Sequence, residues 1–220
     1  MIPMVIRRKI QTATGIWNVV YDAQNRPVRF NSSNGSTIIE CGYDANSRRF
    51  VKKVTQNGTI TKHERYLYRG YNQIAALNLL NGAAPLYALL WEPLESKNSR
   101  PLALVKGGSV YACIQDQNAN VTELMNANGE MVGMYDYAPF GSVSEQGTVS
   151  CPVQWSSEMY DEELGLVYYN YRYYNPLEGR WLSRDLASAD NYVFCHNAPT
   201  VFFDYLGNVA APARLGEPPL

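Results

Sequence analysis

The stretch of sequence that decides the fold runs from residue 159 to residue 207. It reads MYDEELGLVYYNYRYYNPLEGRWLSRD over residues 159–185 and NYVFCHNAPTVFFDYLG over residues 191–207. Tyrosine combines strand preference with a wide apolar ring and a polar tip. We therefore predict a strand over 166–174, preceded by a helical turn over 161–165.

Two Tyr-Asp pairs near the N-terminus, Tyr21-Asp22 and Tyr43-Asp44, stand 22 residues apart. Each is followed by a short polar turn, and then by arginine and apolar residues. A single hairpin is marginal in water, so such repeats need neighbours on both sides. Tight turns are predicted at three Asn-Gly pairs, which begin at Asn34, Asn57 and Asn128.

Together these motifs resemble the C-terminal part of Rhs/YD-repeat proteins, including the Rhs repeat-associated core. The resemblance implies an all-β fold, a curved and spiralling antiparallel sheet of hairpins closed by a core plug. We expect a shell segment over 1–105, the core over 106–208, and a short tail over 209–220 as a remnant of the cargo region. The implied function is a structural shell that encapsulates a C-terminal polypeptide, commonly a toxin, with the remaining repeats as a second partner.

The same resemblance implies an intramolecular aspartyl autoprotease. It places the two carboxylates at Asp185 and Asp204, with Arg184 beside them, and the cut between Asn208 and Val209. Two close carboxylates cannot both ionise, so one can take a proton from water while the other polarises the scissile carbonyl.

The motif departs from the family pattern. Leu186 and Tyr205 stand where proline usually follows each aspartate, and Asn208 replaces the leucine before the cut. A structural role for both aspartates in turns is therefore an open alternative, and Asp190 is a spare carboxylate in the same loop. Ser183 and His196 lack the sequence context of a hydrolytic triad, so we interpret them as structural.

Composition narrows the function classes. The chain has 220 residues and a formal net charge of -1, which argues against a nucleic-acid partner. A basic cluster (Arg48, Arg49, Lys52 and Lys53) is interpreted as a solvated strand face. The cysteines form no CxxC pair and the histidines no ligand cluster, so we expect free thiols, no metal and no cofactor.

The N-terminus does not have the pattern of a signal peptide, and residues 75–90 are too short and broken to span a membrane. We expect synthesis in the cytoplasm, with export by a specialised secretion system or attachment at the cell surface. An unpaired strand edge at the N-terminus predicts self-association. An alternative function is a surface adhesion or carbohydrate-binding module, which would use exposed tryptophans (Trp17, Trp91, Trp155 and Trp181).

Overall fold

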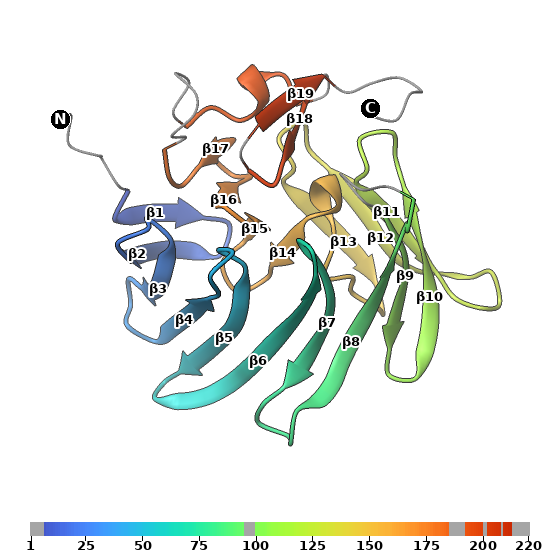
Figure 1. The fold of residues 1–220 in the computed structure, drawn as a ribbon, viewed down its shortest axis with the longest axis horizontal. Coiled ribbons are helices and arrows are strands. Elements are labelled where there is room, and N and C mark those ends of the chain that lie inside the picture. Colours follow the sequence, from blue (N-terminus) through green and yellow to red (C-terminus); the bar gives the residue numbers. More distant parts are fainter. Residues whose placement is uncertain (1–6, 95–99, 185–191, 200–201, 208, 213–220) are drawn as a thin grey trace.

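The computed structural model describes residues 7–94, 100–184, 192–199, 202–207 and 209–212. Within these residues the chain forms a 13-stranded antiparallel sheet in sequence order, a four-stranded sheet and a two-stranded hairpin (Figure 1). The large sheet contains β1 (Lys9–Thr12), β2 (Gly15–Tyr21), β3 (Pro27–Ser32), β4 (Thr37–Tyr43), β5 (Arg49–Gln56), β6 (Thr59–Arg69), β7 (Asn72–Asn78), β8 (Ala84–Trp91), β9 (Pro101–Lys106), β10 (Ser109–Gln115), β11 (Val121–Met125), β12 (Met131–Tyr137) and β13 (Val143–Gly147). The remaining elements are η1 (Trp155–Ser157), β14 (Met159–Asp161), β15 (Leu166–Tyr169), β16 (Arg172–Asn175), β17 (Arg180–Trp181), η2 (Cys195–Asn197), β18 (Phe202–Tyr205) and β19 (Val209–Pro212).

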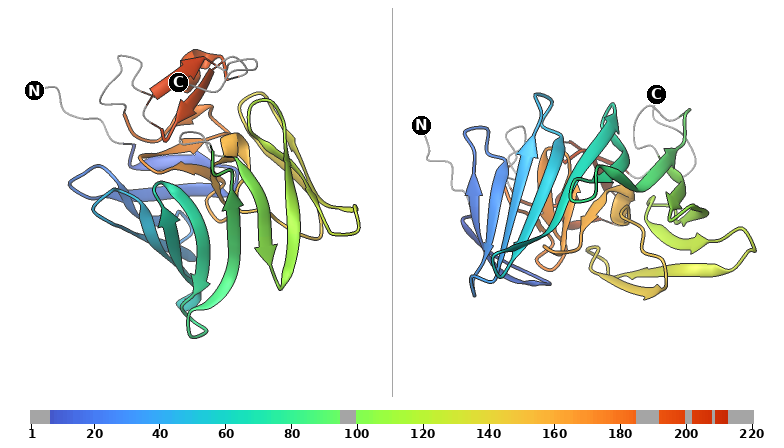
Figure 2. Two further views of the ribbon diagram at one scale, coloured as in Figure 1. Left: turned by 45° about the vertical axis from the view of Figure 1, so that its right-hand side comes forward. Right: turned by 90° about the horizontal axis from the view of Figure 1, so that it is seen from below.

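The large sheet is a curved wall, and the four-stranded sheet β14–β17 lies on its concave side (Figure 2). Phe30, Ile39 and Leu104 of the wall share one buried cluster with Tyr168 and Tyr173 of the inner sheet. The inner sheet is therefore a plug whose side chains complete the core of the wall. The predicted all-β architecture, with a curved antiparallel sheet and a core plug, is confirmed, and the 13-stranded sheet itself is open.

The repeat turns have one shared hydrogen-bond pattern. The Oδ1 atom of Asp22 accepts the backbone N–H groups of Gln24 and Arg26, both at 2.9 Å. Asp44 accepts the equivalent N–H groups of Asn46 and Arg48 at 2.9 and 3.0 Å. In each turn the arginine Nε also donates to Oδ2 of the same aspartate at 2.8 Å. Aspartate thus fixes each turn through its own side chain, as expected from the local chemistry of this residue.

The tyrosine of each pair ties one hairpin to the one before it. The Tyr43 hydroxyl donates to the Pro27 carbonyl at 2.8 Å, and the Tyr21 hydroxyl donates to the Arg7 carbonyl, just before β1, at 3.0 Å. The Arg26 guanidinium lies over the Tyr43 ring, 5.0 Å from its centroid. Tyrosine and aspartate therefore have different tasks, since one links neighbouring repeats and the other closes a turn.

The wall holds the plug through buried ion pairs. Arg49 and Lys52 on β5 reach Asp161 at the end of β14, with N–O distances of 2.5 and 2.7 Å. Arg49 and Lys52 are 2% and 4% exposed, so the interpretation of this basic cluster as a solvated face is wrong for these two residues. The reason is tertiary, because the plug carries the carboxylate that compensates their burial.

The predicted single strand over 166–174 is also wrong. The chain turns at Asn170, whose φ is 58°, and pairs β15 with β16 as a hairpin. All eight residues of β15 and β16 are buried, so alternation between a wet and a dry face is absent from this segment.

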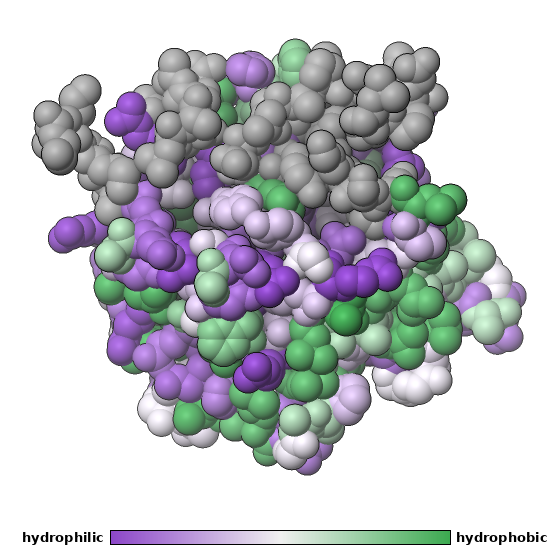
Figure 3. Space-filling view, in the orientation of Figure 1, coloured by the Kyte–Doolittle hydropathy of each residue, from purple (hydrophilic) through white to green (hydrophobic). Residues whose placement is uncertain are grey.

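The predicted domain boundary at 105/106 falls inside β9, and the sheet continues through it to β13. The division into a shell segment, a core and a tail stays a prediction. On the face in Figure 3, hydrophobic residues gather over part of the wall. The exposed large hydrophobic residues of the wall strands include Leu67, Leu90 and Leu102. None of the helices in the described residues is long and apolar enough to cross a membrane.

Candidate functional site

Asp204 lies on β18 and is 6% exposed. Arg172 of β16 approaches it from the plug, with 3.2 Å between Nη2 and Oδ2. The Nε atom of Arg172 donates to the Gly207 carbonyl. One guanidinium therefore fixes both ends of the Asp-x-x-Gly segment.

Gly207 is required by its surroundings. Its φ is +75°, and an added Cβ would lie 3.1 Å from Cβ of Tyr169 and 3.3 Å from Cζ3 of Trp181. The Arg172 guanidinium itself stacks on the Trp181 ring at 4.0 Å. This explains the motif in physical terms, because only glycine combines the left-handed backbone with so close an approach.

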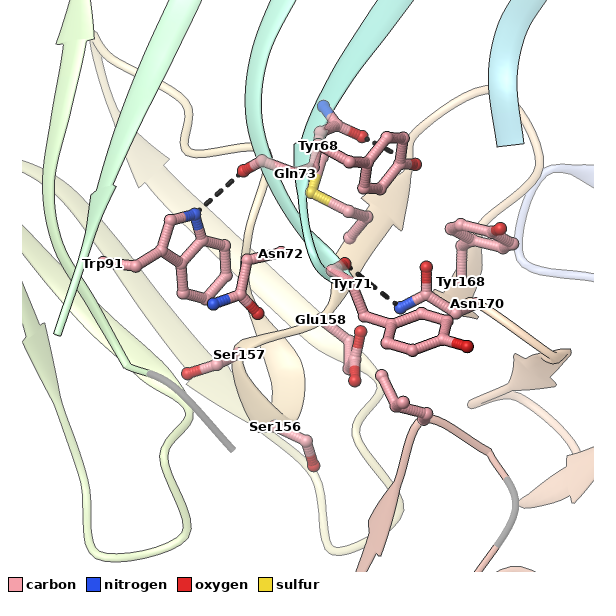
Figure 4. Close-up of a pocket in the computed structure, with 12 residues that line it drawn as sticks. Tyr68, Tyr71, Asn72, Gln73, Trp91, Ser156, Ser157, Glu158, Tyr168 and Asn170 are labelled. Carbon is pink, nitrogen blue, oxygen red and sulfur yellow. Dashed lines mark hydrogen bonds between the residues drawn. The ribbon is translucent and has the colours of Figure 1, made fainter. Parts of the chain in front are cut away.

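Glu158 is a second carboxyl group in the electrostatic field of Asp204. Burial, followed by the negative charge of Asp204, raises the pKa of Glu158 well above its usual range. Glu158 lines a pocket of about 40 Å³ that Leu206 also lines, which is room for a few water molecules. Figure 4 shows its side chain in this pocket, between Ser157 and the side formed by Tyr71 and Asn170.

The structure describes only some of the predicted site residues. Asp185, Asn208 and the spare carboxylate Asp190 lie outside the described residues. Arg184 is half-buried and is the third residue after the end of β17, and Val209 begins β19 opposite Tyr205. The contact between Asp204 and Asp185 is therefore still a prediction.

Two residues of this site were missed by the sequence reasoning. Arg172 lies within a run of aromatic residues. An arginine in such a run is expected to be buried and therefore to need a partner of opposite charge, so the sequence could have indicated a buried ion pair here. Glu158 gave no signal, because its proximity to Asp204 arises only from the fold. Asp204 lies beside an arginine, whereas no ion pair of Glu158 is found within the described part of the chain. Two carboxyl groups with opposite electrostatic environments are a pattern typical of acid–base chemistry.

Other candidate residues have structural surroundings. Ser183 is buried and His196 is exposed, with the His196 ring 5.5 Å from that of Phe202. No group of three or more His, Cys, Asp or Glu side chains among the described residues could hold a metal ion.

The expectation of exposed tryptophans is wrong. Exposed fractions range from 0% to 8% for Trp17, Trp91, Trp155 and Trp181. Trp91, for example, donates through Nε1 to the Gln73 carbonyl at 2.8 Å inside the molecule. The adhesion hypothesis therefore loses these four tryptophans as binding residues.

A curved wall of Tyr-Asp hairpins, filled by an aromatic plug that ends in an Asp-x-x-Gly hairpin, defines a segment of a β-shell protein. The family model described as Teneurin YD-shell matches residues 18–210. The chain belongs to this family of YD-shell proteins, and the predicted relationship to Rhs/YD-repeat proteins is confirmed.

Several curated proteins are similar in sequence. Toxin subunit YenC1 of Yersinia entomophaga is 26% identical, over 74% of this chain and 18% of its own length. Salivary gland surface protein 1 of Aedes aegypti is 26% identical, over 87% of this chain and 6% of its own length. Toxin protein Tse5 of Pseudomonas aeruginosa is 42% identical over 30% of this chain and 5% of its own length. The chain thus spans less than a fifth of each of these relatives.

Solved structures share the fold. A Photorhabdus luminescens Tc holotoxin pore with a TccC3 variant has a TM-score of 0.69 at 17% identity, over 96% of this chain and 11% of that chain. A TcdB2-TccC3-Cdc42 structure has a TM-score of 0.68 at 18% identity, over 91% and 10%.

Proposed function

We propose that this chain is part of a shell that encapsulates a C-terminal polypeptide, with further YD repeats completing the wall. The observation that carries the proposal is the plug fixed on the concave side of an open wall by Asp161, Arg49 and Lys52. Two relatives are named as toxins, which supports a toxin as the cargo and export by a specialised route.

Protection from proteolysis tests the shell. The chain is extended at its N-terminus with further YD repeats and at its C-terminus with a protease-sensitive reporter polypeptide. We expect the reporter to resist proteinase K, and to lose that resistance when Asp161→Asn weakens the link between plug and wall. A reporter cut equally fast with and without the shell would overturn the proposal.

We further infer that the Asp-x-x-Gly hairpin is a self-cleavage site. The proposed machinery is Asp204 with Asp185 and Arg184, and the cut lies between Asn208 and Val209. Supporting this, Asp204 is buried on β18 opposite Ala210 of β19, and Arg172 donates to the Gly207 carbonyl. Misplacement by about 1 Å can cost a hundredfold in rate, so such a clamp matters.

The intact mass of freshly purified protein tests the cleavage. We expect loss of residues 209–220 in the wild type and in the surface control Glu162→Gln, and full-length mass in Asp204→Asn and Asp185→Asn. Full-length mass in the wild type would leave both aspartates as structural residues, without affecting the shell proposal.

A further inference from the structure

Two of the four cysteines meet in space. Cys113 lies on β10 and is half-buried, and Cys151 lies in the segment between β13 and η1 and is fully buried. Both are free thiols in this structure. Cys113 packs against the hydrophobic cluster that contains Cys151, and the two thiols are close enough for each to shift the pKa of the other.

The backbone around Cys151 is held on both sides of β10. The Cys151 N–H donates to the Tyr135 hydroxyl of β12 at 2.6 Å. Lys106 of β9 donates through Nζ to the Ser150 carbonyl at 3.1 Å. Since β10 and β11 lie between β9 and β12, these two hydrogen bonds carry the segment across the strand that contains Cys113.

The segment also lies close to the sheet. A Cβ added at Gly133 of β12 would stand 2.6 Å from the Val149 carbonyl oxygen. Tyr111 and Cys113 share one face of β10, as alternation along a strand requires, and both pack against the buried core. The position of Cys151 relative to Cys113 is thus fixed by contacts between the segment and the sheet.

We propose that Cys113 and Cys151 form an intramolecular disulfide under oxidising conditions, which would tie β10 to the segment where the chain leaves the wall for the plug. A disulfide needs close Cβ atoms and side chains that point toward each other. Cys113 and Cys151 approach this requirement because they pack in the same buried cluster. The bond would close a loop containing β11, β12 and β13.

The reaction proceeds by thiol–disulfide exchange with a low-molecular-weight disulfide such as oxidised glutathione. The Cys113 thiolate attacks it, forms a mixed disulfide and releases one glutathione thiolate. Cys151 loses its proton to solvent and attacks the Cys113 sulfur, which releases the second glutathione. The protein loses two electrons and two protons, and the oxidant becomes two glutathione molecules.

The roles follow from the local environment. The hydrogen bond with Cys151 lowers the pKa of Cys113, while the same bond, together with burial, raises the pKa of Cys151. Cys113 is also the more accessible of the two, so it is the attacking thiol. Cys41 and Cys195 are buried and burial raises the pKa of each, so they serve as controls.

The test uses the full chain, reduced and then incubated with a glutathione redox buffer. Free thiols are blocked with N-ethylmaleimide in denaturant and the intact mass is measured. We expect the number of alkylated cysteines to fall from four to two, with a peptide cross-link between Cys113 and Cys151. The oxidised form should melt roughly 5–10 °C higher than the reduced form.

Cys113→Ser should abolish the cross-link and the thermal shift, whereas Cys195→Ser should keep both. Because Cys113 is half-buried, this variant decides the question even if Cys151→Ser fails to fold. Four alkylated cysteines in the oxidised wild type, a cross-link to any other cysteine, or glutathione retained on Cys113 would each overturn the proposal.

Discussion

At the residue scale, buried ion pairs join charged residues that lie far apart in the sequence. Arg49 and Asp161 are separated by 112 positions, yet both are almost fully buried and paired. Burial alone would raise the pKa of Asp161, but the charges of Lys52 and Arg49 outweigh it and hold that pKa at about 2. This pairing therefore stabilises the fold above the unfolded pKa of an aspartate and is lost as the pH falls toward 2.

Asp161→Asn should lower the free energy of unfolding by about 3–5 kcal/mol, because it leaves Arg49 and Lys52 buried with much of their compensation removed. Urea unfolding at pH 7 measures this. The adjacent Glu162→Gln is the matched control, since the Glu162 side chain is 64% exposed and should change stability by less than about 1 kcal/mol. Equal effects of the two substitutions would contradict the prediction.

Glu158 predicts the opposite dependence on pH. Burial, and then the charge of Asp204, raises the pKa of Glu158 in the folded state. The neutral carboxyl group therefore contributes fully to the stability of the fold below the unfolded pKa of a glutamate. This contribution is lost as the pH rises through the folded pKa. We expect the melting temperature of the wild type to fall between about pH 5 and pH 8 more steeply than that of Glu158→Gln. Thermal unfolding across this range, with Glu162→Gln following the wild type, is the measurement. Parallel curves for all three proteins would refute a buried, proton-binding Glu158.

At the scale of elements, the unit of construction is a hairpin closed by aspartate and linked by tyrosine. The same aspartate pattern recurs at Asp116, which accepts the N–H groups of Asn118 and Asn120, both at 2.9 Å. Here Asn120 replaces arginine as the partner of Oδ2. The repeat therefore extends beyond the two Tyr-Asp pairs that the sequence shows most clearly.

Asp44→Ala should cost about 1–3 kcal/mol, the contribution of hydrogen bonds to a charged group, because it frees the backbone N–H groups of Asn46 and Arg48. Chemical denaturation measures the loss. Asp136→Ala is the control, since Asp136 lies exposed on β12 and closes no turn. A cost at Asp44 no larger than at Asp136 would show that the turn is fixed by its backbone alone.

At the scale of the whole molecule, the wall has two edges. Among the described strands, β1 and β13 each pair on one side only. In the register of β1 with β2, Gln11 and Ile16 form a non-hydrogen-bonded pair, so their N–H groups point away from each other. On the outer side of β1, the Asn175 side chain of the plug donates to the Gln11 carbonyl at 2.7 Å. The Gln11 N–H therefore faces the edge where a further repeat would be added.

Gln11→Pro should reduce self-association of the isolated chain, because it removes a donor from the free edge while leaving the ladder with β2 intact. Sedimentation velocity over a range of concentrations measures this. Ile10→Pro is a comparison that should instead unfold β1, since the Ile10 N–H bonds to β2 and its side chain is buried. Unchanged association in Gln11→Pro would exclude the β1 edge as the contact surface.

The sequence alone predicted the hairpins, the turns and the family. These depend on local chemistry, since an Asp or Asn-Gly turn is fixed within about five residues and the strands between turns follow from alternation. It also predicted Asp204 and Gly207 as a functional motif, but by resemblance rather than by geometry.

Tertiary structure alone decided what the buried polar residues do. From the sequence the basic cluster on β5 was interpreted as surface, but in the fold Arg49 and Lys52 pair with Asp161 of the plug. The four tryptophans were expected to be exposed, but two separate buried clusters contain them. Likewise Arg172 of the plug pairs with Asp204 of β18, and Cys113 of the wall packs against the cluster that contains Cys151, only because the fold brings these distant segments together. Contacts between distant parts of a chain form only when the whole fold brings them together, so no local pattern could indicate them.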